Sequence, residues 1–402
     1  MWTEFWTTSR ICQHLQDMGC EIVVGRDLFS EGAMRYGMPS PEYMENAYNS
    51  ALERGAEKEL LENMRGGYTG VLAIFRTGKP GSKTTFRFDI DALPVEEANG
   101  EEHIPTREGF ASMNNNMHAC GHDGHIAIGL GLARRISKAV EEGELSGDIR
   151  VLFQPAEEGG VGGGALAMNP LVINANHFMS VHLGIYPVRR LICGMHFLSL
   201  QKYNITYNGR STHAAAYPDE GRNALLAACN AVTQLYAIPR HKDGASRINV
   251  GEFHSNNALN IISPETKFKV EVRGETNTIQ QYMDTQAKKI LEGTANIHGC
   301  QCTIEDDGGT VASSNSPEMI DMARKAALAR GVPEEALIDT YTVMGSEDAT
   351  YIMEAVKRNG GKVLYMCLGS PTRGGHHNPL FDFDEDLLGV GVDVLWDMLK
   401  TL

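Results

Sequence analysis

The sequence lacks long apolar runs and an excess of positive charge. No apolar stretch approaches the ~20 residues that a membrane-spanning helix needs, and the N-terminus has neither the basic nor the apolar region of a signal peptide. Lys and Arg number 36 against 51 Asp and Glu, for a formal net charge of -15. Because a protein that follows nucleic-acid phosphates needs a basic stripe, we expect neither a nucleic-acid partner nor a membrane partner.

The sequence also lacks the dense cysteine framework of a disulfide-stabilised secreted domain. Its eight cysteines are scattered along the chain. This spacing favours a reducing compartment, so we expect a cytoplasmic protein.

What is present is an α/β pattern that is interrupted once. From Gly70 to about Gly194, short apolar runs alternate with helical patterns, which is typical of a layered α/β domain with a largely parallel sheet. Residues 196–309 instead follow the order β-α-β-β-α-β of a ferredoxin-like α+β sandwich. The α/β pattern then returns. We therefore expect a discontinuous domain of residues 1–195 and 310–402, with a smaller inserted domain of residues 196–309.

The stretch "NMHACGHDGH" lies directly before a helical pattern. Cys120 and His122 are two residues apart on a glycine-containing turn, close enough to hold one cation or to bridge two. Thiolate and imidazole suit zinc and similar metals. The same residues are also compatible with a cysteine nucleophile and its histidine base, or with a solvated histidine-rich turn.

Further metal-ligand candidates follow predicted strands. In "QPAEEGG", neighbouring side chains on an extended turn point in different directions, so one of Glu157 and Glu158 can ligate a metal while the other acts as a general base. His182 ends an apolar run, and His376 and His377 precede an Asn-Pro turn. Each feature alone is weak, but together they are the inventory of a binuclear metal site.

The inserted domain contributes two more candidates. His213 lies in a turn of small residues before a helix and could donate a hydrogen bond to an oxyanion; a surface histidine is the alternative. Arg273 ends a predicted strand and could clamp a carboxylate, or form a surface ion pair.

Several motifs together resemble the amidohydrolase branch of the M20 metallopeptidases. They are "DIDALP", "MHACGHDGH", "FQPAEEG", "GRNALLAA" and "HHNPLFDFDED", and the similarity extends over nearly the whole chain. The resemblance implies a zinc-peptidase-like catalytic metal-binding domain of residues 1–195 and 310–402, with a lid/dimerisation domain of residues 196–309.

The resemblance also implies a set of site residues. It implies two divalent metal ions in each protomer, manganese or zinc, with Cys120 as the bridging ligand. The other ligands would be His122, Glu158, His182 and His377, where His377 is preferred to His376 because it fits the family pattern His-Asn/Ser-Pro-x-aromatic.

Roles for the remaining candidates follow from the same resemblance. Glu157 would be the general base, and His213 would complete the oxyanion hole, in its own or in a partner protomer. Asn260 and Arg273 would hold the substrate's carbonyl and α-carboxylate, and Asp91 would support the ligands from behind.

The expected activity is metal-dependent hydrolysis of an amide bond. The resemblance favours p-aminobenzoyl-glutamate, a folate breakdown product, as substrate, with p-aminobenzoate and glutamate as products. Alternatives are another N-acyl amino acid (hippurate-like or an indole-acyl conjugate), a thiol hydrolase, and a non-catalytic scaffold protein. The expected partners are a small-molecule N-acyl amino acid and, in a homodimer or heterodimer, a second copy or a homologous B subunit.

The sequence departs from the family pattern at two places. Family members carry a helical segment before the point at which this chain begins, so we expect exposed apolar surface on the first helix, at Phe5, Ile11 and Leu15. Ser263 stands where the branch usually has proline, so we expect a looser loop around Asn260.

Overall fold

The computed structural model describes residues 1–402, which form two compact units. The first unit contains Met1–His196, Ser313–Val343 and Asp348–Leu402. The second contains Phe197–Ala312 and Met344–Glu347, so its main segment interrupts the first unit in the sequence. No helix in either unit has both the length and the apolar character needed to cross a bilayer.

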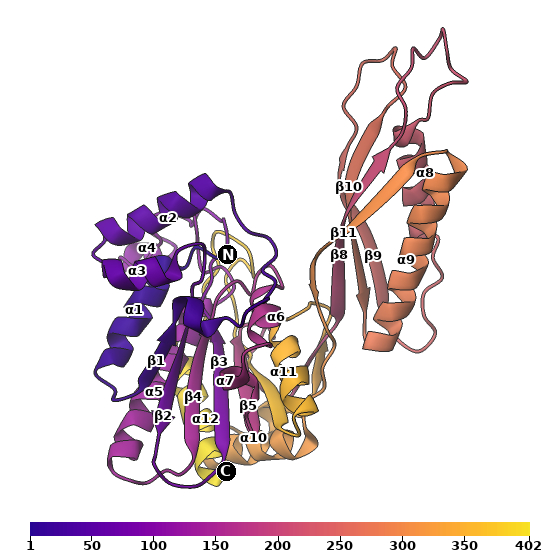
Figure 1. Cartoon of the computed structure of the whole chain (residues 1–402). Helices are drawn as coiled ribbons and strands as arrows, with labels where there is room; N and C mark the ends of the chain where they lie inside the picture. The colour runs from indigo at the N-terminus through magenta and orange to yellow at the C-terminus, as the bar shows by residue number, and fades with distance from the viewer. The chain divides into compact units, whose positions relative to one another are not determined.

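The first unit is built on an eight-stranded mixed sheet (Figure 1). Its strands, in spatial order, are β1 (Glu21–Val24), β2 (Val71–Arg76), β4 (Asp148–Gln154), β3 (Lys83–Asp89), β5 (His177–Leu183), β14 (Lys362–Leu368), β6 (Leu191–Ile192) and β12 (Leu337–Ile338). The four central strands, β4, β3, β5 and β14, run parallel. Antiparallel pairings join β1 to β2, β2 to β4, and β14 to β6. The predicted parallel sheet is therefore confirmed at the centre.

Helices of the first unit form groups around this sheet. The long helix α5 (His122–Glu141) packs with α12 (Asp386–Thr401), which contacts α10 (Pro317–Ala329). On the opposite face, α11 (Ala349–Arg358) packs with α6 (Gly162–Leu166) and α7 (Pro170–Ile173) (Figure 1). The unit also contains α4 (Ile104–Arg107) and two 3-10 turns, η1 (Gly25–Leu28) and η2 (Glu334–Ala336). The layered α/β class predicted from the sequence is thus correct.

The first helix is covered, contrary to the expectation from the sequence. Helix α1 (Phe5–Gln16) contacts α2 (Pro41–Glu53) and α3 (Lys58–Met64). Phe5, Ile11 and Leu15 are all buried. Phe5 meets Tyr48 of α2 edge-on, with ring centroids 5.9 Å apart, and Ile11 and Leu15 belong to the main core. The prediction of exposed apolar surface was wrong, because the chain's own helices and sheet bury this face.

The second unit has the predicted ferredoxin-like order. Its elements are β8 (Ser199–Asn208), α8 (Ala224–Tyr236), β9 (Ser246–His254), β10 (Glu265–Gly274), α9 (Asn277–Ile297) and β11 (Gln301–Thr310). They form an antiparallel sheet in the order β11-β8-β10-β9. Residues on β10 alternate between buried and exposed, and α9 buries Met283, Ala287, Leu291 and Ala295 against the sheet at helical spacing. Separately, β7 (Met195–Phe197) pairs with β13 (Tyr341–Val343).

The central parallel strands place several polar residues at one edge of the first sheet. Asp89, Gln154 and His182 lie at or next to the carboxyl ends of β3, β4 and β5. In open α/β sheets, the crevice outside these carboxyl ends is where ligands bind. The loops leaving this edge are therefore the place to look for a site.

Candidate metal centre

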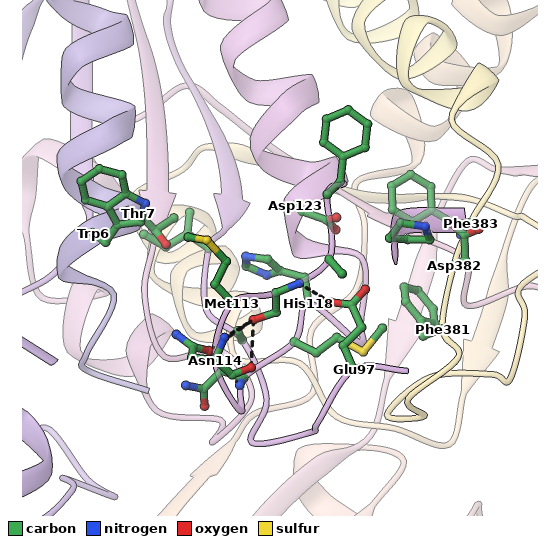
Figure 2. Close-up of a pocket in the computed structure, with 18 of the residues that line it drawn as sticks. Trp6, Thr7, Glu97, Met113, Asn114, His118, Asp123, Phe381, Asp382 and Phe383 are labelled. Atoms are coloured by element: carbon green, nitrogen blue, oxygen red, sulfur yellow. Dashed lines mark hydrogen bonds between the residues drawn. The ribbon is translucent and has the colours of Figure 1, made fainter. Parts of the chain in front are cut away.

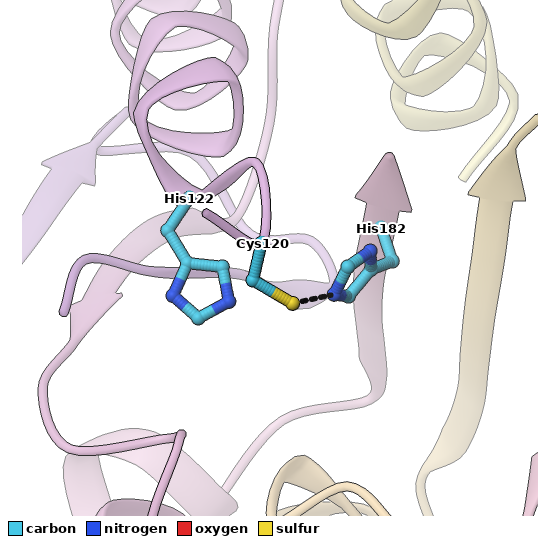
Figure 3. A group of neighbouring side chains, drawn as sticks. All are labelled: Cys120, His122 and His182. Carbon is cyan, nitrogen blue, oxygen red and sulfur yellow. Dashed lines mark hydrogen bonds between the residues drawn. The ribbon is translucent and has the colours of Figure 1, made fainter. Parts of the chain in front are cut away.

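The turn before α5 brings a thiol and an imidazole to the carboxyl edge of the sheet. Gly121 separates them and has φ 88°, a left-handed conformation that glycine adopts without strain. His122 is the first residue of α5 and is completely buried. The Cys120 sulfur lies 3.8 Å from Nε2 of His182, and Figure 3 shows these two side chains pointing toward each other. The predicted grouping of Cys120, His122 and His182 is therefore present in the structure.

Hydrogen bonds to backbone carbonyls orient the two histidine rings. His182 Nδ1 lies 2.7 Å from the carbonyl oxygen of Leu183, and His122 Nδ1 lies 3.0 Å from that of Asp91. A carbonyl only accepts, so each Nδ1 carries the proton. Both Nε2 atoms are then left with a lone pair, which is the form in which imidazole binds a metal.

The paired glutamates follow β4 on a strained turn. Ala156, immediately before them, has φ 58°, an uncommon conformation for a residue other than glycine and one that often marks a functional site. Glu157 Oε2 and Glu158 Oε1 each lie 3.9 Å from His122 Nε2. The two carboxylates therefore converge on one nitrogen, whereas we expected them to diverge. Glu158 also reaches His377, with Oε2 3.4 Å from its Nε2.

Asp91 positions two of the candidate ligands, His122 and Glu158, through hydrogen bonds. Its carboxylate Oδ2 accepts the backbone N–H of Glu158 at 3.0 Å, and its backbone carbonyl is the acceptor for His122 Nδ1. Asp91 is almost fully buried. One aspartate thus ties the turn after β4 to the start of α5.

Both histidines of the C-terminal motif approach the site. His377 has φ 60°, and its backbone N–H donates to the carbonyl of Ala119 at 2.8 Å. His377 groups with Cys120 and Glu158. His376, which we had passed over, also lies close, with Nδ1 3.5 Å from the Cys120 sulfur. The family pattern that selects His377 therefore selects the residue that reaches Glu158.

The polar atoms at this centre fit a cation. His122 Nε2 and Glu158 Oε1 are buried without a hydrogen-bond partner, which is costly unless another group satisfies them. Burial raises the pKa of Glu158 to about 7. Their 3.9 Å separation is shorter than two metal–ligand bonds of about 2.0–2.2 Å each, so one ion can contact both atoms. Two ligand groups share Cys120, namely Cys120, His122, His182 and Cys120, Glu158, His377.

The environment of Cys120 does not favour a free nucleophile. Burial raises the pKa of its thiol and outweighs the lowering of that pKa by His122, and the carboxylates of Glu158 and Glu157 raise the pKa further. Reactive cysteines have the opposite environment, in which positive groups lower the pKa. A bound cation would supply such a charge and deprotonate the thiol. The geometry thus suits a metal ligand better than the thiol-hydrolase alternative.

Three further candidates lie in the second unit. The backbone N–H of Ala214 donates to the carbonyl of Asn260 at 2.8 Å, so the His213 and Asn260 segments run side by side. Arg273 does not stand free: its Nε donates to Glu271 at 2.7 Å, which is the ion pair that we had considered as the alternative. The segments of His213 and Asn260 therefore lie together. Arg273 instead pairs with Glu271 on its own strand, β10.

Ser263 ties down its loop. Its hydroxyl lies 2.7 Å from the hydroxyl of Ser255 and donates to the carbonyl of Glu265, and its own carbonyl accepts the N–H of Ala224. Ser263 is also buried. These bonds do not support the looser loop that we expected when serine replaces proline.

A cavity of about 860 Å³ is lined in part by the loop that precedes α5. Figure 2 shows residues around this cavity. Its lining includes Trp6, His118, Asp123 and Phe383. His118 donates to the same Asp91 carbonyl that orients His122, so the two sites share a loop. None of the candidate ligands lines this cavity. The candidate metal centre is therefore the cluster that contains the three residues of Figure 3.

Two further buried residues, Asp89 and His125, lie next to the cluster and were not among the residues predicted from the sequence. His125 lies in the same histidine-rich motif, three residues after His122, a spacing that puts both on one face of α5. This spacing is the feature of the sequence that could have identified His125 as a site residue.

Comparisons with known proteins agree with the geometry. The profile described as Peptidase family M20/M25/M40 matches residues 85–401. Indole-3-acetyl-aspartic acid hydrolase of Enterobacter agglomerans is 38% identical over 98% of this chain and 90% of its own length. The p-aminobenzoyl-glutamate hydrolase of Escherichia coli K12 matches through its A subunit, which is also 38% identical, over 98% of this chain and 90% of its own length.

A solved structure is also similar to this chain over its whole length. The aminobenzoyl-glutamate utilization protein of Klebsiella pneumoniae superposes with a TM-score of 0.80 and 32% identity, covering 100% of this chain and 91% of that one. The resemblance seen in the motifs is thereby confirmed, and the chain belongs to peptidase family M20/M25/M40.

Proposed function

We propose that this protein is a binuclear metal-dependent amide hydrolase that cleaves p-aminobenzoyl-glutamate to p-aminobenzoate and glutamate. The observation that carries the proposal is the convergence of five candidate ligand side chains from four segments, with a further carboxylate beside them. The substrate is suggested by the relatives, two of which are named for aminobenzoyl-glutamate.

Five residues would hold the two ions. Cys120 would be shared between them, and His122, Glu158, His182 and His377 would be the other ligands. The thiolate and imidazoles suit zinc, whereas the carboxylate and imidazoles also accept manganese. When bound, such ions would lower the pKa of water and polarise the amide carbonyl.

Glu157 would move the protons. Its carboxylate is nearly buried and lies 3.9 Å from His122 Nε2, at the edge of the ligand cluster. It would take a proton from the attacking water and return it to the leaving amine. Asp91 would keep Glu158 and His122 in place during both steps.

His213 has the tautomer needed to stabilise an oxyanion. Its Nδ1 accepts backbone N–H groups from Ala215 and Ala216, at 3.3 and 3.1 Å, so the proton resides on Nε2. The exposed Nε2–H would donate to the tetrahedral oxygen, in its own or in a partner protomer. Asn260 would hold the substrate's carbonyl, and Arg273 would hold its α-carboxylate. To do so, Arg273 would give up its hydrogen bond to Glu271.

The first unit would be the catalytic metal-binding domain and the second a lid/dimerisation domain. The second unit offers an edge strand, β9, together with exposed Leu226 and Tyr236 on α8. An uncovered edge with apolar neighbours is typical of a pairing surface. Its occupant would be a second copy or a homologous B subunit.

A cytoplasmic location stays a prediction, supported by eight free cysteines.

A second substrate is favoured by one specific finding. The relative named for indole-3-acetyl-aspartic acid is as similar as the relative named for p-aminobenzoyl-glutamate, at 38% identity each. Both substrates join an aromatic acyl group to an acidic amino acid through an amide. The chemistry of the metal centre would serve either.

The test compares the two substrates on the purified chain loaded with manganese or zinc. We expect release of glutamate from p-aminobenzoyl-glutamate to exceed release of aspartate from indole-3-acetyl-aspartate in kcat/KM. The reverse order would assign the second substrate. A metal-loaded chain that hydrolyses neither substrate, nor a hippurate-like one, would support the scaffold alternative.

A further inference from the structure

His125 connects the two histidines of the metal cluster. It is completely buried on α5, one turn after His122. Its ring stacks on that of His122, with centroids 5.3 Å apart, and meets the ring of His182 edge-on at 4.5 Å. A single side chain therefore packs against two candidate ligands that come from different segments. The proposed mechanism assigns no role to it.

Hydrogen bonds fix the orientation of the His125 ring. Its Nε2 lies 2.9 Å from the backbone N–H of Leu183, which can only donate, so Nε2 must accept. Nδ1 then carries the proton and donates to Oδ1 of Asp89. Leu183 is also the residue whose carbonyl accepts from His182 Nδ1. His125 thus holds the end of β5 that presents His182.

Asp89 is itself held rigidly. It is completely buried at the end of β3, and its Oδ2 accepts from Arg87 Nη1 at 2.7 Å. The other arm of Arg87 donates to Asp348 at 3.0 Å. Two buried carboxylates therefore fix Arg87, and Arg87 fixes Asp89. Hydrogen bonds therefore run without a break from Arg87 through Asp89 and His125 to the backbone of Leu183.

We propose that Asp89 and His125 are positioning residues of the metal centre. They hold the His122 and His182 rings in the orientation that ligates metal, through ring packing and through the hydrogen bond to Leu183. This inference rests on the proposed function only in requiring that the cluster bind metal. The partners of a metal ligand commonly set its orientation, and their loss costs about 10- to 100-fold in metal affinity or activity.

The protein contains a matched pair for comparison. His103 is also buried in the first unit and also pairs with a carboxylate, with Nε2 2.8 Å from Glu97 Oε1. It has no ring contact or hydrogen bond with a candidate ligand. If the Asp89–His125 pair only stabilises the core, changes at His103 and His125 will have the same kind of effect.

The experiment measures cobalt binding by the full chain without substrate. The variants are His125→Phe, which keeps ring packing without hydrogen bonds, His125→Gln, whose oxygen can accept from Leu183, and His125→Asn, whose amide can donate to Asp89. His103→Phe is the control. Affinity for Co²⁺ is measured by competition with a chromophoric chelator. The visible spectrum of the Co²⁺ protein reports the coordination of the metal, and thermal unfolding measures stability.

We expect His125→Phe to weaken Co²⁺ binding about 10- to 100-fold and to shift the thiolate–cobalt and d–d bands. His125→Gln will retain more affinity than His125→Asn, because the bond to Leu183 positions His182. His103→Phe will lower the unfolding temperature while affinity and spectrum stay unchanged.

Wild-type affinity and spectrum in folded His125→Phe would overturn the proposal, as would an equal loss in His103→Phe. If His125→Phe does not fold, wild-type values in both His125→Gln and His125→Asn would overturn it. The readout separates this inference from the substrate assignment: a chain that binds cobalt but cleaves neither aromatic acyl amino acid would refute the activity alone. A wild-type chain that binds no cobalt would refute both.

Discussion

The Cys120 sulfur lies 3.8 Å from Nε2 of His182, although 62 residues separate them in the sequence. Cys120 ends the loop that leads into α5, and His182 lies at the carboxyl end of β5, beside β3 and β14. Parallel strands deliver their carboxyl ends to one edge of the sheet, so residues from distant segments meet there. This contact joins separate motifs into one candidate metal centre.

Replacing Glu157 with glutamine should leave a metal-loaded but nearly inactive protein. The amide keeps the shape of the side chain but cannot accept a proton, and a general base typically contributes about 10²- to 10⁴-fold in rate. Turnover of p-aminobenzoyl-glutamate and metal content by elemental analysis are the two measurements. Turnover near the wild-type value would remove Glu157 as the base.

Removing metal should abolish hydrolysis, and restoring it should recover activity. Metal that binds only the folded state also adds stability, about 2.7 kcal/mol at a free concentration of 100 times Kd. The unfolding temperature should therefore rise on adding manganese or zinc to chelator-treated protein, and Cys120→Ser should diminish the rise. Full activity that persists in excess chelator would instead favour a thiol hydrolase.

Truncating His213 should reduce turnover without changing metal content. Loss of one oxyanion donor typically costs about 100- to 1000-fold in kcat. His241→Ala is the control, because His241 lies in the same unit and its Nδ1 likewise accepts a backbone N–H, from Asp243. If His213→Ala loses metal in proportion to activity, the residue acts on the metal centre and not on the oxyanion.

Replacing Arg87 with methionine should destabilise the protein by about 3–5 kcal/mol, because it leaves Asp89 and Asp348 buried without their cation. Arg76→Met is the matched control. Arg76 lies on β2, is 52% exposed and pairs with Glu21 and Asp148, so its loss should cost about 1 kcal/mol or less. Urea unfolding measures both changes, and similar effects for the two variants would contradict the importance of the buried cluster.

Much of the fold was predictable because it depends on local patterns. The order of strand and helix patterns in residues 196–309 predicted the inserted β-α-β-β-α-β unit, and the structure has that order. The cover over α1 was not predictable in this way. Phe5 is buried by Tyr48 of α2, and no local feature of α1 shows that a later helix will fold back onto it.

The sequence by itself determined which residue types were available: a thiol, imidazoles and paired carboxylates, each next to an apolar run that predicts a buried strand or helix. Their chemistry and spacing predicted a binuclear metal site, and the resemblance of the motifs to the M20 metallopeptidases implied a metal-dependent hydrolase. Only the tertiary structure decided which of these groups meet. It turned both Glu157 and Glu158 toward His122, brought His376 as well as His377 to the candidate site, and placed Asp89 and His125 next to His122. The reason is physical: periodicity reports which face of an element is buried, whereas contacts across a sheet edge depend on strand order and loop conformation.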